Sequence, residues 1–213
     1  LDSPLKLKAS IPSHNAIHAN AHALARYAAI CQAGGIVPIV EPEVLMDGDH
    51  DIDHCAEVTE WVLKEQFMEL YFAGVQLEGI ILKPNMVIAG KKCARQAGAE
   101  EVAEKTLEVL KRCVPTAVPG IAFLSGGQSS VDATRHLSLM NAAGPLPWRL
   151  TFSYGRALQA DALHWAAGSR AADSRRNDDV ADILSNHSGG HRDRGSDGQK
   201  DSGYPRAGHR HLP

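Results

Sequence analysis

The chain has 213 residues, of which 44% are hydrophobic and 22% charged, a composition typical of a globular protein with one sizeable domain or two small ones. Its net charge of −3 does not favour nucleic acid or an anionic membrane surface as a partner, and no apolar run reaches the roughly 18 residues of a membrane span. Four cysteines stand without a CxxC pair, and the first residues have no signal-peptide layout. We therefore expect free thiols and a cytoplasmic location.

The first predicted element is a helix over residues 15–35, which a pair of glycines ends. Three histidines, His14, His18 and His22, recur every four residues and so share one face of this helix. Such a stripe has the spacing of metal ligands, but no second set of ligands is evident nearby in the sequence. We therefore interpret it as a solvated helix face and expect no metal site.

An apolar run over residues 35–42 predicts a buried strand, with Glu41 and Glu43 at its end. Side chains two apart in an extended chain point the same way, so both carboxylates are candidates for general acid–base chemistry at one site; exposed loop acids are the alternative. The aspartate-rich stretch 46–53 lacks the glycine and the closing glutamate of a calcium loop. We expect instead a loop with an aspartate N-cap for a helix over residues 53–72.

The next apolar run, residues 77–84, predicts a second buried strand with Lys83 at its end. Lysine is seldom buried, because removing an ammonium from water is costly. Lys83 is therefore either a solvated cap or a desolvated amine that can attack a carbonyl carbon.

Two more helices, over residues 99–113 and 129–144, alternate with strands over 120–127 and 149–155. Glycines in the turns after these strands would let backbone N–H groups approach an anion, and an arginine adds a forked cationic donor. Ordinary tight turns are the alternative. The candidate phosphate-binding residues are Ser125, Gly126, Gly127, Ser153, Gly155 and Arg156.

The alternation of near-continuous apolar strands with helices predicts an α/β domain with a parallel sheet over residues 1–167. Either a (β/α)8 barrel or an open doubly wound sheet satisfies this pattern, although the first strand lacks the glycine-rich turn of a dinucleotide-binding fold. Residues 168–213 are rich in Arg, Asp, Ser, Gly and His, and we expect a low-complexity, disordered tail there.

Four stretches, "IVPIVEPEVLMDGDHDIDHC", "LEGIILKPNMV", "VPGIAFLSGGQS" and "LTFSYGRALQADAL", closely resemble class I (Schiff-base) fructose-bisphosphate aldolases, in the same order and spacing. The resemblance implies a (β/α)8 TIM barrel, here about four βα units of it. It also implies glycolytic, reversible cleavage of fructose 1,6-bisphosphate to dihydroxyacetone phosphate and glyceraldehyde 3-phosphate, with no metal or cofactor, by a cytosolic homotetramer.

The same resemblance assigns roles to the candidate residues. Lys83 matches the Schiff-base lysine, Glu41 the principal acid/base glutamate and Glu43 the carboxylate beside the lysine. Ser125 and Gly126 match a loop that holds a substrate phosphate, and Arg156 matches the arginine that clamps it.

The family has about half a barrel before the matching region, and "LKLKAS" resembles the end of its fourth strand. Half a barrel would leave strand edges unpaired and the inner face open to water. We therefore expect this 213-residue chain by itself to fold poorly or lack activity. A non-catalytic aldolase remnant or an interaction protein that reuses half a barrel is the alternative to the enzyme.

Overall fold

Parallel strands form the centre of the molecule in the computed structural model, which describes residues 3–6 and 12–166. Strands β2 (Ile39–Val40), β4 (Ile81–Leu82), β5 (Gly120–Phe123) and β6 (Arg149–Phe152) pair in this order, and every pair is parallel. Within this four-stranded sheet the strands pair in chain order, as is usual for βα units arranged one after another.

The first predicted strand, over residues 35–42, is wrong in its bounds. The structure has two short strands there, β2 and β3 (Pro42–Leu45), and β3 pairs with β1 (Ser3–Lys6) rather than with β4. Prolines at positions 38 and 42 have no N–H to donate to a ladder. The chain therefore changes its hydrogen-bonding partner at Glu41, between the two strands.

The other strands are also shorter than the apolar runs that predicted them. The run 77–84 begins as a short 3-10 helix, Leu77–Gly79, and only Ile81–Leu82 pairs as a strand. A strand ends where its backbone no longer forms hydrogen bonds with the neighbouring strand. The apolar composition of a run does not show where this happens. The four-stranded sheet of β2, β4, β5 and β6 agrees with the predicted partial barrel of about four βα units, and β1 overlaps the start of the stretch that resembles the end of a preceding strand.

Within residues 3–6 and 12–166 the α-helices that follow the strands are α1 (His14–Ala33), α2 (Ile52–Phe72), α3 (Ala99–Cys113), α4 (Ser130–Ala142) and α5 (Arg156–Ala166). Asp51 caps α2 by accepting a hydrogen bond from the N–H of His54, at 2.8 Å, which confirms the predicted capping role of the aspartate-rich loop. Ser129 caps α4, since its hydroxyl accepts from the N–H of Asp132 at 3.0 Å.

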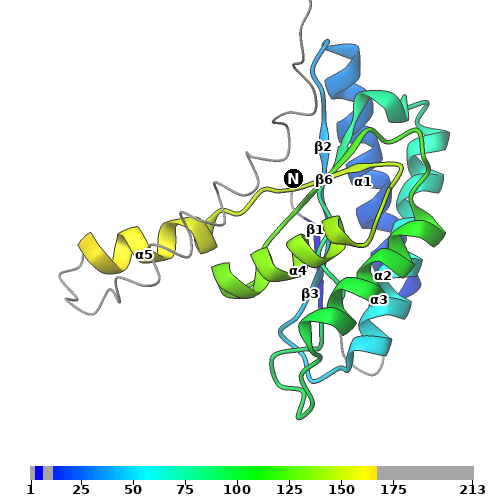
Figure 1. Ribbon diagram of the computed structural model, residues 1–213. Helices are drawn as coiled ribbons and strands as arrows, with labels where there is room; N and C mark the ends of the chain where they lie inside the picture. The colour runs from blue at the N-terminus through cyan, green and yellow to red at the C-terminus, as the bar shows by residue number, and fades with distance from the viewer. Residues whose placement is uncertain (1–2, 7–11, 167–213) are drawn as a thin grey trace, which may run out of the picture.

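The hydrophobic core lies between the sheet and helices α1 to α4, with α1, α2 and α3 side by side (Figure 1). Leu24, Leu63, Leu82, Ile121 and Phe123 are essentially fully buried in it. Burial of side chains of this size contributes about 1.5–3 kcal/mol each, so this layer holds the strand ends in place.

The predicted free thiols are confirmed, and the predicted tail falls outside the described residues. All four cysteines are free thiols, and among the described residues no helix is long and apolar enough to cross a membrane. The expected disordered tail, residues 168–213, lies outside the described residues, as does residue 167.

The expectation that the histidine stripe has no second set of ligands nearby is wrong. Nδ1 of His18 lies 2.6 Å from Oε1 of Glu65, and Nδ1 of His22 lies 2.8 Å from Oε2 of Glu69. The register in which α1 packs against α2 cannot be predicted from the sequence of either helix alone. Carboxylates of α2 consequently face the imidazoles of α1.

Candidate active site

The carboxyl ends of the strands are held at one level by backbone hydrogen bonds. The N–H of Lys83 donates to the carbonyl of Val40 at 2.7 Å, and the N–H of Ser153 donates to the carbonyl of Phe123 at 2.8 Å. Between them, the N–H of Leu124 donates to the carbonyl of Pro84 at 3.2 Å. The side chains that follow β2, β4, β5 and β6 therefore lie along one edge of the sheet, the usual position of an active site in parallel α/β folds.

A close charged pair at this edge joins two of the predicted site residues. Nζ of Lys83 lies 2.8 Å from Oε1 of Glu41, and the two side chains are 19% and 17% exposed. Partial removal from water strengthens the interaction between the charges relative to an exposed pair. The distance also permits proton transfer between the amine and the carboxylate, which are the two partners that imine chemistry needs.

Glu43 lies two residues beyond Glu41, within β3. Both glutamates are half-buried, whereas Pro42 and Val44 are buried, which is the alternation of a strand with one face in the core. The structure thus agrees with the two carboxylates sharing one face of the strand.

Asn85, which sequence reasoning did not single out, connects the segment after Lys83 to the rest of the fold. Its Oδ1 accepts from the N–H of Val44 at 3.0 Å, and its Nδ2 donates to Oγ1 of Thr59 at 3.3 Å and to the carbonyl of Met86 at 3.1 Å. Asn85 is only 2% exposed. The available signal was a polar residue in an otherwise apolar run, since buried amides are almost always hydrogen-bonded.

The loop after β5 is a tight turn in which two glycines adopt the left-handed conformation. Gly126 and Gly127 both adopt positive φ angles, +58° and +72°, a region that residues with a Cβ rarely occupy. A Cβ on Gly126 would lie 2.7 Å from Cε of Met46, so a larger residue would also collide there. Ser125 precedes the glycines and closes the turn, because its carbonyl accepts the N–H of Gln128 at 3.0 Å.

The loop after β6 contains the remaining predicted phosphate-binding residues. Ser153 and Gly155 are exposed, and Tyr154 between them is buried and donates its hydroxyl to the carbonyl of Ala133 at 2.9 Å. Burial raises the pKa of Tyr154 well above its ordinary value, so this residue is a neutral anchor. Arg156 is the first residue of α5, and its side chain lies outside the described atoms.

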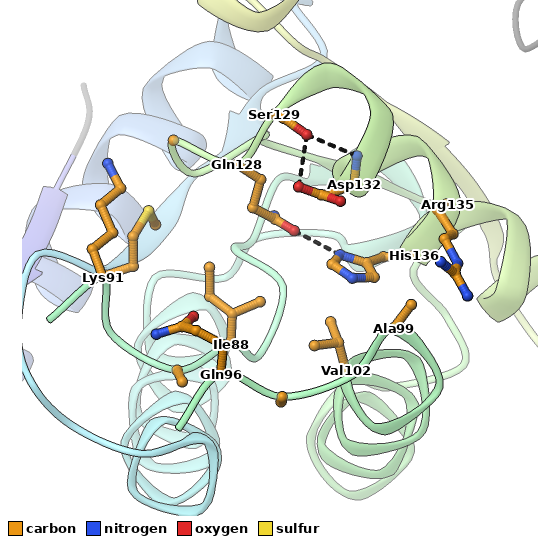
Figure 2. A pocket seen from close by; sticks show the side chains of 14 residues that line it. Ile88, Lys91, Gln96, Ala99, Val102, Gln128, Ser129, Asp132, Arg135 and His136 are labelled. Atoms are coloured by element: carbon orange, nitrogen blue, oxygen red, sulfur yellow. Dashed lines mark hydrogen bonds between the residues drawn. The ribbon is translucent and has the colours of Figure 1, made fainter. Parts of the chain in front are cut away.

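A lysine missed by sequence reasoning borders the glycine loop. Lys91 lies on the loop after β4, and its Nζ is only 2.6 Å from the position that a Cβ on Gly127 would take. Lys91 and Gly127 line one side of a pocket of about 430 Å³ between the starts of α3 and α4. Figure 2 shows Gln128 and His136 across this pocket, joined by a hydrogen bond of 2.7 Å.

The protein has an α/β fold with parallel strands. An amine and a carboxylate lie at the carboxyl ends of neighbouring strands, beside a glycine loop, and this arrangement resembles an enzyme active site. The family model for class-I fructose-bisphosphate aldolase matches residues 2–192. This chain belongs to that family.

Individual relatives agree. The chain is 61% identical over 153 residues to a probable class 1 fructose-bisphosphate aldolase of Xanthomonas campestris, covering 72% of this chain and 46% of the relative. It is 56% identical over 169 residues to human fructose-bisphosphate aldolase B, covering 79% and 46%. A structure of Plasmodium falciparum fructose-bisphosphate aldolase, in complex with TRAP and a small-molecule inhibitor, superposes with a TM-score of 0.77 at 46% identity, over 87% of this chain and 52% of that one.

These matches settle the fold left open by the pattern of strands and helices. The fold belongs to the TIM-barrel family, of which the described residues form a part, and the open doubly wound alternative is excluded. The chain spans about half the length of the curated relatives it matches.

Proposed function

We propose that Lys83 is the nucleophile of a class I aldolase site that acts on phosphorylated ketoses, with fructose 1,6-bisphosphate as the substrate. The observation that carries this proposal is the 2.8 Å contact between Nζ of Lys83 and Oε1 of Glu41 at the carboxyl ends of β4 and β2. A neutral amine is needed for attack on the ketone, and Glu41 is placed to accept its proton.

The reaction then follows the ordinary chemistry of an imine. The Lys83 amine adds to C2 of the ketose, and the carbinolamine loses water, with a proton supplied by a carboxylic acid, to give an iminium ion. Removal of the C4 hydroxyl proton breaks the C3–C4 bond, releases glyceraldehyde 3-phosphate and leaves the bond electrons in an enamine. Protonation of C3 and hydrolysis by water release dihydroxyacetone phosphate and restore the amine. We assign these proton transfers to Glu41 and Glu43.

Phosphate binding is assigned to the two loops beyond β5 and β6. Backbone N–H groups around Ser125, Gly126 and Gly127 suit one phosphate, because successive N–H groups in left-handed turns form a concave donor set. The loop after β6 also suits a phosphate, because the N-terminus of α5 offers backbone N–H groups and Arg156 offers a guanidinium. Ser153 and Gly155 are the loop residues assigned to the same ligand. We further propose a homotetrameric assembly and a cytoplasmic location, following the family resemblance of the sequence.

Proton exchange in the half-reaction tests the proposal. If the chain is incubated with dihydroxyacetone phosphate in D2O, a working site would replace a hydrogen on the hydroxymethyl carbon by deuterium, observed by proton NMR, because the enamine reforms the iminium by taking a solvent deuteron. Exchange would therefore support the proposal and refute the expectation that this chain by itself lacks activity. Lys83→Met should abolish the exchange, and Lys92→Met, which removes an exposed lysine of the following loop, should not. Exchange that survives Lys83→Met would overturn the assignment of the nucleophile. Absence of exchange in the unaltered chain would favour the non-catalytic alternative.

A further inference from the structure

Two pairs of metal-ligating side chains face each other across the contact between α1 and α2. His18 and His22 stand one turn apart on α1, and Glu65 and Glu69 stand one turn apart on α2. The pairs meet in the same order, His18 with Glu65 and His22 with Glu69, because the two helices lie side by side and run parallel (Figure 1). Ligand atoms of His18, Glu65 and Glu69 therefore converge from two rigid elements, and His22 contacts only Glu69 of this group, at 2.8 Å.

The spacing of the ligand atoms suits a single small cation. One ligand atom each of His18, Glu65 and Glu69 lies within 4.8 Å of the other two. The separate distances are 2.6 Å for His18 Nδ1 to Glu65 Oε1 and 3.5 Å for His18 Nδ1 to Glu69 Oε1. Ligand atoms around a tetrahedral Zn²⁺, with bonds of about 2.0–2.2 Å, stand roughly 3.4 Å apart. Small side-chain rotations would bring these atoms to that spacing.

The two carboxylates at this position are partly buried. The Glu69 side chain is only 9% exposed and that of Glu65 is 22% exposed, so two carboxylates are held partly out of water. A neutral imidazole supplies a hydrogen bond to each but no charge.

We propose that His18, His22, Glu65 and Glu69 form a site for a divalent transition-metal ion, with Zn²⁺ as the best match. Two imidazoles and two carboxylates are a ligand set typical of zinc and unlike the all-oxygen sets of Ca²⁺ or Mg²⁺. The metal ion and a proton compete for the same lone pair on the imidazole nitrogen. Metal binding therefore releases any proton on His18 to the solvent. The ion would cross-link α1 and α2, and its role is independent of the proposed aldolase chemistry.

Calorimetric titration of the untagged full chain with zinc chloride tests the site. The matched pair of variants is His18→Asn with His22→Asn, which removes two ligands, against His14→Asn, which removes the third histidine of the same stripe. His14 stacks on His18 with ring centroids 6.5 Å apart, whereas His22 contacts the Glu69 carboxylate at 2.8 Å. A third variant, His209→Asn with His211→Asn, accounts for zinc held by histidines elsewhere in the chain.

We expect the unaltered chain to bind one zinc ion at this site. The His14 variant and the His209/His211 variant should bind it with an affinity within about threefold of the unaltered chain. Loss of two ligands should weaken that event by more than about tenfold, since even changes beside metal ligands commonly cost 10–100-fold. Glu65→Gln with Glu69→Gln, which keeps side-chain size, should have the same effect. Zinc should also raise the Tm of the unaltered chain and not that of the ligand variants.

Either of two results overturns the proposal: no zinc binding by the unaltered chain, or equal binding by the His18/His22 variant and the His14 control. Circular dichroism of each metal-free variant checks that it is folded. If the buried Glu69 proves necessary for folding, His18→Asn alone decides the matter, because the His18 side chain is 52% exposed and its replacement leaves the core intact.

Discussion

Replacing Asn85 by alanine tests the inference that this side chain fixes the segment following Lys83. The amide makes three hydrogen bonds, to the N–H of Val44, to Thr59 and to the carbonyl of Met86. It therefore joins the loop after β4 to β3 and to α2. Truncation removes all three bonds at a position that is 2% exposed.

The expected cost comes mainly from the donor that loses its acceptor. The N–H of Val44 would be left buried and unpaired, at about 1–3 kcal/mol, because the full desolvation of the donor is then uncompensated. Thr59 can turn towards Sγ of Cys55, 3.9 Å away, and the Met86 carbonyl retains acceptor capacity, so these two losses add about 1 kcal/mol together. The free energy of unfolding should fall by about 2–4 kcal/mol.

Urea unfolding followed by circular dichroism measures this change. Asn15→Ala is the matched control, because Asn15 is exposed on α1, where alanine is a better helix former. The control should change the free energy of unfolding by less than about 0.5 kcal/mol. A loss below about 1 kcal/mol in Asn85→Ala, comparable to the control, would contradict the role assigned to Asn85.

Three further predictions follow from local environments. Burial raises the pKa of the Cys55 thiol to about 11, so Cys55 should react with a thiol reagent at neutral pH far more slowly than the partly exposed Cys93; equal rates, measured by peptide mapping, would refute this. Gly90→Ala should lower stability by about 1–3 kcal/mol in urea unfolding, because the new Cβ would lie 2.3 Å from the backbone oxygen of Gly48; an unchanged midpoint would mean that the loop shifts freely. Burial lowers the pKa of His136 below 6.5, so the unfolded chain gains a proton first as pH falls, and stability should drop below about pH 6.5. His136→Gln should reduce that drop, measured as Tm against pH, and an identical profile would argue against it.

The helices could be predicted from the sequence because their signals are local. The predicted helix over 99–113 has the observed bounds, and Asp51 and Ser129 cap helices as their residue types suggest. The alternation of helices with apolar runs also predicted the parallel sheet. The hydrophobic period of a helix, its capping residues and the glycines or prolines that end it all lie within a few residues of the positions they determine.

What could not be predicted depends on which distant segments meet. An apolar run suggested one strand over residues 35–42, yet Ile36 and Val37 are 62% and 60% exposed and the paired residues lie further along. The proximity of Lys83 to Glu41 was expected from strand ends and resemblance, whereas the contact of His18 with Glu65 was not. That contact depends on the register between α1 and α2. The packing of both helices in the hydrophobic core determines which of their surfaces face each other.

Borohydride trapping tests the assignment of Lys83 most directly. The chain is incubated with dihydroxyacetone phosphate and reduced, so that any imine becomes a stable secondary amine, and the digest is analysed by mass spectrometry. The account predicts the added mass on the peptide bearing Lys83, with Lys91 and Lys92 unmodified as internal controls. A label on those loop lysines to the same extent, or an unlabelled Lys83 beside a labelled full-length relative, would contradict it.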